Sequence, residues 1–201
     1  GKMILENNKD SYSESLAEEL DKIDNFTEQA LFYARSNYVE KDYILKKLNL
    51  EEVVREVIRK NKKALISGRF SIDLHDLDVS VYSDSKWLAF ILNQILANSI
   101  KYRKEDSAGI EWYAVKEKEK VILCLKDRGI GIPVMDAGRV FEKGFTGSNG
   151  RSGKKSTGIG LYLSKKLCEK MGHKICLTSK EGEGCEVLIT FPKGSMTGFL
   201  E

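Results

Sequence analysis

Apolar and polar residues recur along the chain with several different periods, and each period predicts a different element. From about residue 11 to residue 48 the apolar positions recur every three or four residues, which is typical of one long amphipathic helix. The first row is Leu16, Leu20, Ile23, Thr27, Ala30 and Ala34, and the flanking row is Ala17, Leu31, Tyr38 and Leu45. A face this wide predicts self-association in a bundle or coiled coil. The alternative is a helix that packs back onto its own domain.

The pattern changes at Asn49. A short amphipathic helix is expected there, because Asn49 and Glu52 have capping-box spacing. Its apolar residues are Leu50, Val53, Val54, Val57 and Ile58. Two strand-like runs follow at residues 70–74 and 79–82, and a second helix is expected at residues 86–101.

The second half of the chain alternates in the same way. Further strands are expected at residues 110–115, 121–125, 174–179 and 185–191, with a helix at residues 158–171. Residues 128–157 are rich in Gly, Ser and Lys, and a loop of this length in a compact domain is usually functional. The order predicts an α/β fold for residues 49–201, a two-layer sandwich of helices on a mixed sheet, preceded by a long helix within residues 1–48.

The composition of the chain gives no support for two classes of function, nucleic-acid binding and crossing a membrane. The 201 residues are 41% apolar, and 33 basic against 30 acidic residues give a net charge of +3, so nothing favours nucleic-acid binding. No stretch approaches the roughly 20 apolar residues that cross a bilayer, and we expect no membrane contact by this chain. The four cysteines form no CxxC pair, and we expect small core residues of a reduced compartment. They are Cys124, Cys168, Cys176 and Cys185.

Three short strings of residues contain side chains or glycines that could bind a ligand. In the helix at residues 86–101, Gln94, Asn98 and Lys101 form one polar stripe. The amide oxygen of Asn98 is a hard ligand suited to Mg²⁺ on phosphate oxygens, and Lys101 can reach a phosphate. Tyr102 offers a flat surface to a base or ribose. The alternative is an ordinary amphipathic helix with a solvated polar face.

The second string follows an apolar strand. A carboxylate at Asp127 can accept a hydrogen bond from the exocyclic amine of adenine, whereas guanine presents a carbonyl there. Gly129 and Gly131 let the backbone turn closely around a base. The alternative is a plain Asp-Gly turn.

The third string, residues 157–161, opens a helix after the flexible stretch. Exposed amides at a helix N-terminus bind anions, and Gly158 and Gly160 allow phosphates to approach closely. The string is neither a Walker A motif nor the start of a Rossmann unit. A metal ligand, an adenine acceptor and a phosphate-binding turn, in this order, predict an ATP site.

These strings resemble the boxes of one superfamily. Residues 94–102 resemble the N box of sensor histidine kinases, residues 127–132 and 157–161 the two glycine boxes, and residues 140–147 the phenylalanine box. Gly182 to Cys185 resembles the final glycine motif, with Cys185 where the family often has Thr. The resemblance implies the Bergerat ATP-binding fold, with a lid at about residues 133–157. It implies an ATP site of Gln94, Asn98, Lys101, Tyr102, Asp127, Gly129, Gly131, Ile132, Lys143, Thr157, Gly158, Ile159, Gly160 and Leu161, with Asn98 holding Mg²⁺.

The amino-acid sequences of four segments resemble those of one subgroup, the intramembrane-sensing kinases that respond to bacitracin and other peptide antibiotics. These segments are residues 28–36, 84–88, 144–147 and 149–151. That resemblance implies an ABC transporter as a possible partner of the parent protein. It also makes residues 1–48 the second helix of a dimerisation and phosphotransfer hairpin, and implies a homodimer.

The chain departs from the family in two ways. Gln94 stands where the family usually has Asn and where ATP-hydrolysing relatives have a Glu base, so it argues against hydrolysis. Neither His75 nor His173 lies in an acceptor motif, and both are expected to be surface or packing residues. We therefore expect the acceptor histidine upstream of Gly1, and a chain unable to autophosphorylate alone.

The resemblance implies the cytoplasmic, catalytic portion of a membrane-anchored bacterial two-component kinase. With ATP and Mg²⁺ as cofactors, it would donate the γ-phosphoryl group to a histidine for relay to a response regulator. The alternatives are an ATPase clamp of the same superfamily, a non-catalytic ATP-binding scaffold, and a serine kinase of the anti-sigma type, which would not need the long helix.

Overall fold

The computed structural model describes residues 23, 27, 43–105, 108–147 and 157–193, and the chain divides into two units, Gly1–Asp42 and Tyr43–Glu201. The predicted N-terminal helix is wrong at residues 43–48, because residues 43–45 are not helical and residues 46–49 form a strand that pairs with residues 80–83. The rest of that helix falls outside the described residues except at Ile23 and Thr27. Both of these are helical, and Thr27 Oγ1 donates a hydrogen bond to the Ile23 carbonyl at 2.9 Å. The bundle helix, its self-association and the division at residue 48 stay predictions.

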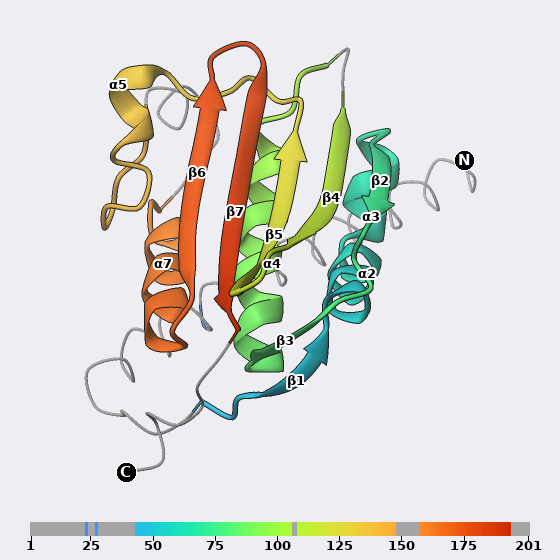
Figure 1. Cartoon of the computed structure of the whole chain (residues 1–201). Helices are drawn as coiled ribbons and strands as arrows, with labels where there is room; N and C mark the ends of the chain where they lie inside the picture. The colour runs from blue at the N-terminus through green and yellow to red at the C-terminus, as the bar shows by residue number, and fades with distance from the viewer. Residues whose placement is uncertain (1–22, 24–26, 28–42, 106–107, 148–156, 194–201) are drawn as a thin grey trace. The chain divides into compact units, whose positions relative to one another are not determined.

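The second unit is built on a five-stranded mixed sheet (Figure 1). In spatial order the strands are β2 (Ser71–His75), β4 (Gly109–Lys116), β5 (Lys120–Asp127), β7 (Gly184–Pro192) and β6 (Lys174–Lys180). β2 runs parallel to β4, and every other neighbouring pair is antiparallel. A separate antiparallel pair joins β1 (Lys46–Asn49) to β3 (Ser80–Ser83). The strand β1 was not predicted, because its four residues are mostly polar and its partner lies far along the chain.

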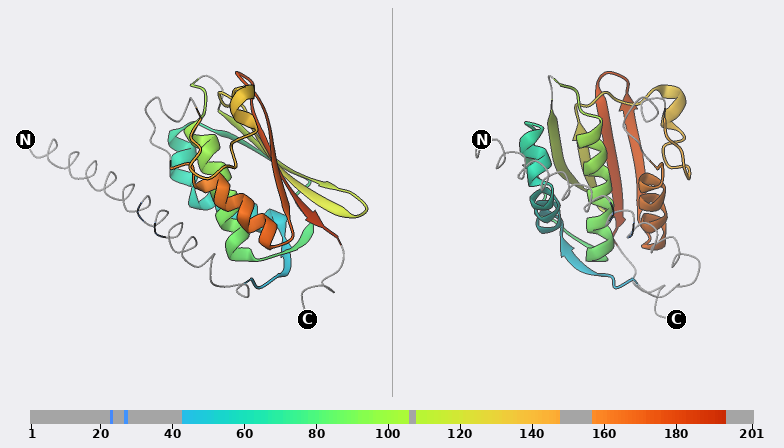
Figure 2. Two further views of the ribbon diagram at one scale, coloured as in Figure 1. Left: turned by 90° about the vertical axis from the view of Figure 1, so that its left-hand side faces the viewer. Right: turned by 180° about the vertical axis from the view of Figure 1, so that it is seen from behind.

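Helices form the second layer. The described helices are α2 (Leu50–Lys60), α3 (Lys62–Ser67), α4 (Ser85–Lys101), α5 (Val134–Ala137) and α7 (Gly160–Lys170). Figure 2 shows α2, α4 and α7 on one face of the sheet, whereas Figure 1 looks onto the other face, which none of the described helices covers. The predicted two-layer α/β sandwich is confirmed. No helix in the described part of the chain is both long and apolar enough to cross a membrane.

The core lies between the two layers and has the predicted helix face at its centre. The α4 residues Leu88, Ile91, Leu92, Ile95 and Leu96 are all buried. Opposite them the sheet contributes Trp112, Leu123, Leu125 and Phe191.

Side-chain caps fix where these helices begin. Asp84 Oδ1 accepts the amides of Lys86 and Trp87 at the start of α4, and Asn49 Oδ1 accepts two amides at the start of α2. The cap predicted at Asn49 is therefore present. The helices α3 and α5 were not predicted, because a six-residue and a four-residue helix have too few turns to show a period.

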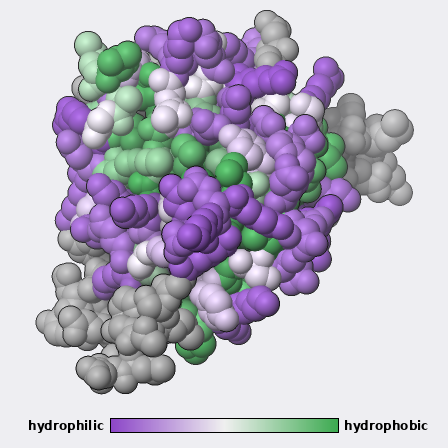
Figure 3. All heavy atoms as spheres, viewed as in Figure 1, coloured by the Kyte–Doolittle hydropathy of each residue, from purple (hydrophilic) through white to green (hydrophobic). Residues whose placement is uncertain are grey.

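One prediction about the cysteines was wrong, because one of them is exposed on the open face of the sheet, the face that none of the described helices covers. Cys124 and Cys168 are buried and Cys185 is partly buried, but Cys176 is exposed. The strand register places Tyr113, Cys124, Leu188 and Cys176 in one row across this face. Cys176 lies on β6, which is the last of the described strands at this edge of the sheet. Figure 3 shows a green apolar patch on part of this face, with purple hydrophilic residues around it.

Candidate nucleotide-binding site

Asp127, the last residue of β5, lies at the centre of a buried hydrogen-bond network and is 9% exposed. Ser99 Oγ donates to Asp127 Oδ2 at 2.7 Å, while the amides of Gly129 and Cys185 donate to Oδ1 at 2.8 and 3.1 Å. A carboxylate has about four acceptor positions. Three are used by the described residues, so one position on Oδ2 is left for a further donor, such as the amine of adenine.

The polar stripe of α4 leads to this carboxylate. Gln94 and Asn98 are partly buried on α4, and Lys101 Nζ lies 5.2 Å from the centre of the Tyr102 ring. The Tyr102 carbonyl accepts the Ile130 amide at 3.0 Å, which holds the end of α4 against the loop that follows β5. The structure therefore brings the first two candidate strings together.

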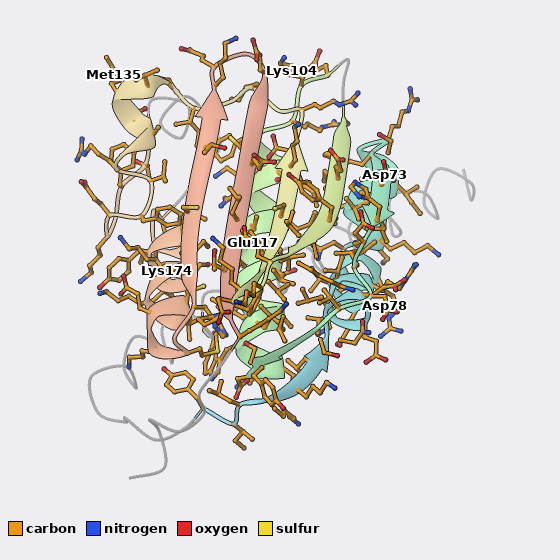
Figure 4. The ribbon with its side chains drawn as sticks, viewed as in Figure 1. Asp73, Asp78, Lys104, Glu117, Met135 and Lys174 are labelled. Atoms are coloured by element: carbon orange, nitrogen blue, oxygen red, sulfur yellow. The ribbon has the colours of Figure 1, made fainter. Side chains whose placement is uncertain are left out.

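The loop after Asp127 packs against the turn between β6 and β7. Gly131 has a φ of +70°, and a Cβ there would lie 2.2 Å from the Lys180 carbonyl oxygen, so the position requires glycine. The next amide, that of Ile132, donates to Ser179 Oγ at 2.9 Å. Lys104, labelled in Figure 4, donates to the Gly182 carbonyl and closes the same turn from the segment after α4.

The third string lies at the start of α7 and touches both α4 and the lid segment. Gly158 has a φ of +64°, and its carbonyl accepts the Gly144 amide at 3.0 Å, which places the exposed Lys143 beside the turn. A Cβ on Gly160 would lie 2.6 Å from Gln94 Oε1, so the glycine allows α7 to approach α4 closely. The helix itself begins at Gly160, and its first-turn amides have no partner within the helix. Thr157, Ile159 and Leu161 flank these glycines, with the Ile159 amide 3.4 Å from Thr157 Oγ1.

The residues present fit a magnesium nucleotide. Asn98 supplies a neutral oxygen ligand, and Mg²⁺ commonly takes few protein ligands and completes its shell with water and phosphate oxygens. Asn98 is therefore the residue that would hold the ion on the phosphates.

Sequence reasoning missed Ser99, Ser179 and the role of Cys185. Ser99 is 5% exposed on the apolar side of α4, and a polar residue at a core position was the available signal. Ser179 Oγ donates to the Gly184 carbonyl at 2.7 Å and lies 3.1 Å from Cys185 Sγ. Burial raises the pKa of the Cys185 thiol to about 11, so it is a neutral thiol beside the Asp127 carboxylate.

The two histidines lie outside this network, as expected. His75 is exposed at the end of β2. His173 is buried with its ring centre 4.7 Å from that of Phe191, and its Nε2 lies 3.0 Å from Ser83 Oγ. Burial lowers the pKa of His173 to about 4, so the ring is neutral at pH 7.

Known proteins resemble this chain in sequence and in fold. Residues 83–195, more than half of the chain, match the family described as histidine kinase-, DNA gyrase B-, and HSP90-like ATPase. The sensor histidine kinase YxdK of Bacillus subtilis is 32% identical over 94% of this chain and 58% of that protein. The sensor protein BceS of Halalkalibacterium halodurans is 35% identical over 83% of this chain and 49% of that protein. The chain thus spans about half the length of the curated relatives it matches.

Solved structures show the same fold at lower identity. The catalytic domain of histidine kinase ThkA is 23% identical with a TM-score of 0.64, covering 75% of this chain and 96% of that domain. Full-length ShkA in complex with AMPPNP is 20% identical with a TM-score of 0.74, covering 92% of this chain and 39% of ShkA. Family model, relatives and fold agree, and the chain therefore belongs to the histidine kinase-, DNA gyrase B- and HSP90-like ATPase family, among its sensor histidine kinases.

Proposed function

We propose that this chain binds Mg-ATP and donates the γ-phosphoryl group to a histidine on a separate helix. The observation that carries the proposal is the fixed carboxylate of Asp127, which is held by three donors and keeps one acceptor position on Oδ2. In a buried site an acceptor of this kind favours adenine over guanine, because guanine would present a carbonyl oxygen to it.

The phosphates would lie between α4 and the N-terminus of α7. The first amides of α7 donate to phosphate oxygens, and Gly158 and Gly160 leave room for their approach. Lys101 and Lys143 supply positive charge on either side. Mg²⁺ held by Asn98 would neutralise charge on the phosphate oxygens.

In the transfer step the imidazole nitrogen of the acceptor histidine attacks the γ-phosphorus. The bond from the γ-phosphorus to the bridging oxygen breaks as the N–P bond forms, and ADP leaves with both bonding electrons. Such a step depends mainly on positioning and charge stabilisation. A base within this chain is therefore not required.

The side chain of Gln94 favours transfer over hydrolysis. An amide cannot take a proton from water. Packing of Gln94 Oε1 against Gly160 supports a role in joining α4 to α7. An ATPase clamp and a non-catalytic ATP-binding scaffold are the alternatives, and each predicts no phosphohistidine.

The parent protein would be a membrane-anchored bacterial two-component kinase whose cytoplasmic part includes this chain. Its acceptor histidine would lie upstream of Gly1, and residues 1–48 would complete a dimerisation hairpin. A response regulator would then receive the phosphoryl group. In support, a solved structure with a TM-score of 0.67 is histidine kinase ThkA in complex with response regulator protein TrrA. An ABC transporter partner follows from the subgroup resemblance alone.

The test supplies a separate acceptor hairpin that contains its histidine. The chain is incubated with γ-labelled ATP and Mg²⁺, and the hairpin is assayed for acid-labile, base-stable phosphate. We expect label on the hairpin, none on this chain alone, and little free phosphate. ATP binding with no transfer would refute the kinase proposal, and sustained phosphate release would favour the ATPase clamp.

A further inference from the structure

A second cluster of polar side chains lies on the open face of the sheet, opposite the helix layer. Asp73 and His75 belong to β2 and Glu111 to β4. One nitrogen or oxygen atom from each side chain lies within 4.8 Å of the others. Figure 4 shows Asp73 at the β2 edge of the sheet, whereas α5 lies beyond the opposite edge.

The backbone brings these side chains together. In the parallel pair β2–β4, Asp73 is opposite Glu111 and His75 is opposite Tyr113. Because side chains alternate along a strand, all four lie on the open face, while the intervening Trp112 is buried beneath the helices. The spacing Asp-x-His on one strand, with Glu on its neighbour, therefore forms a three-donor set.

The ring of His75 is oriented on three sides. Its Nε2 lies 2.8 Å from Glu111 Oε1 and its Nδ1 lies 3.2 Å from Asp76 Oδ2. The Tyr113 ring stacks on it at 5.3 Å with an interplanar angle of 3°. When Nδ1–H donates to Asp76, the Nε2 lone pair points toward the carboxylates. Histidines that bind metals usually make this second hydrogen bond, which fixes the tautomer and the ring direction.

We propose that Asp73, His75 and Glu111 bind a Zn²⁺ ion, with water as the fourth ligand and Asp76 orienting the His75 ring. A mixed set of imidazole and carboxylates suits zinc better than Mg²⁺ or Ca²⁺, which prefer oxygen ligands alone. Bonds of about 2.1 Å in a tetrahedral site put ligand atoms about 3.4 Å apart. His75 Nε2 and Glu111 Oε1 are 2.8 Å apart and would have to separate by about 0.6 Å to admit the ion. The exposed Asp73 and partly exposed Glu111 side chains can make this adjustment by rotating.

The charge of the cluster favours a cation. Three carboxylates, those of Asp73, Asp76 and Glu111, surround one imidazole. A bound ion would relieve the repulsion between the carboxylates. It would also tie the edge strand β2 to β4, so we expect slower amide hydrogen exchange at residues 71–75 when zinc is present.

The test titrates the whole chain with ZnCl₂ by calorimetry and follows the histidine imidazole signals by NMR. The chain has two histidines, so the His75 signals are assigned by their loss in His75→Gln. We expect binding of one ion, shifts of His75 with His173 unchanged, and loss of binding in His75→Gln and Asp73→Asn. Asp76→Asn should weaken binding about 10- to 100-fold, the usual effect of removing such an orienting carboxylate.

Glu117→Gln is the matched control for Glu111→Gln, because Glu117 is an exposed carboxylate just beyond the end of β4 that lies outside the cluster (Figure 4). It should bind zinc as the unaltered chain does, whereas Glu111→Gln should not. Thermal melts without zinc establish that each variant is folded. Binding retained in His75→Gln, binding lost in Cys176→Ser, or no binding by the unaltered chain would each overturn the proposal. The last result would leave the cluster as a hydrogen-bonded ion-pair network.

Discussion

The substitution Asp127→Asn tests the adenine assignment with little change of shape. The remaining side-chain oxygen can still accept the amides of Gly129 and Cys185, and the Ser99 hydroxyl can rotate to accept from the new amide. The position that accepted from adenine then carries an N–H₂ group, which faces the amine of the base. In the variant, the introduced side-chain amide and the adenine amine are both donors, so they repel each other where a charge-assisted hydrogen bond was present before.

A hydrogen bond to a charged group contributes about 1.5–3 kcal/mol, so the affinity for ATP should fall about 10- to 150-fold. The affinity for GTP should change less or rise, since the introduced amide can donate to the guanine carbonyl. Titration with fluorescent ATP and GTP analogues measures both. An unchanged ATP-to-GTP ratio would refute the reasoning.

The matched control is Asp84→Asn. Asp84 is also a buried carboxylate that accepts backbone amides, those of Lys86 and Trp87 on Oδ1 and that of Ile44 on Oδ2, but it caps the other end of the 17-residue α4. At 1.5 Å per residue that end is about 25 Å from the Asp127 side. Since Asn is also a good cap, this variant should keep its nucleotide affinity and the cap of α4. It loses the hydrogen bond from the Ile44 amide, so its melting temperature should fall without a change in ATP affinity.

Four further predictions follow from single sites. Ser99→Ala removes one donor to Asp127 and should weaken ATP binding several-fold in the same titration, with Ser99→Thr as the conservative comparison. Gly158→Ala should nearly abolish ATP binding, measured by calorimetry, because φ is +64° and a Cβ would lie 2.4 Å from the Gly144 carbonyl carbon. Burial lowers the pKa of His173 to about 4, so its contribution to the free energy of unfolding is complete above about pH 6.5. Up to about 3 kcal/mol of that free energy is lost as the pH falls from about 6.5 toward 4. Thermal melts of His173→Gln should therefore depend less on pH between about 6.5 and 4. Cys176 should react first with a thiol reagent, and mass spectrometry of the labelled peptides would contradict the exposure pattern if Cys168 reacted first.

The sequence predicts those elements whose side chains repeat over several turns or pleats. The apolar face of α4 and the five main strands follow from such periods, and their burial confirms the pattern. The strand β1 was not predicted because its identity depends on pairing with residues 80–83, far along the chain. Short helices such as α5 are fixed by contacts with neighbouring segments, and such contacts leave no periodic pattern of apolar residues in the sequence. The exposure of Cys176 depends on β6 being an edge strand, and strand order is a property of the whole sheet.

Some residues of the candidate site were predicted from the sequence, and others were found only in the structure. Asp127, Asn98 and Gly158 were found because each lies in a short string with its own chemistry, whereas Ser99 and the Cys185 amide come from segments distant in sequence. These two donors and Gly129 hold one carboxylate from α4, from β7 and from the loop after β5. A backbone amide donates whatever its side chain is, so the residue at position 185 can differ from the Thr usual in the family without loss of that bond. The hydroxyl of Ser99 has no such substitute. We therefore expect nucleotide affinity to tolerate Cys185→Thr and to be reduced by Ser99→Ala, and equal losses in both variants would mean that the thiol, too, contributes to the site.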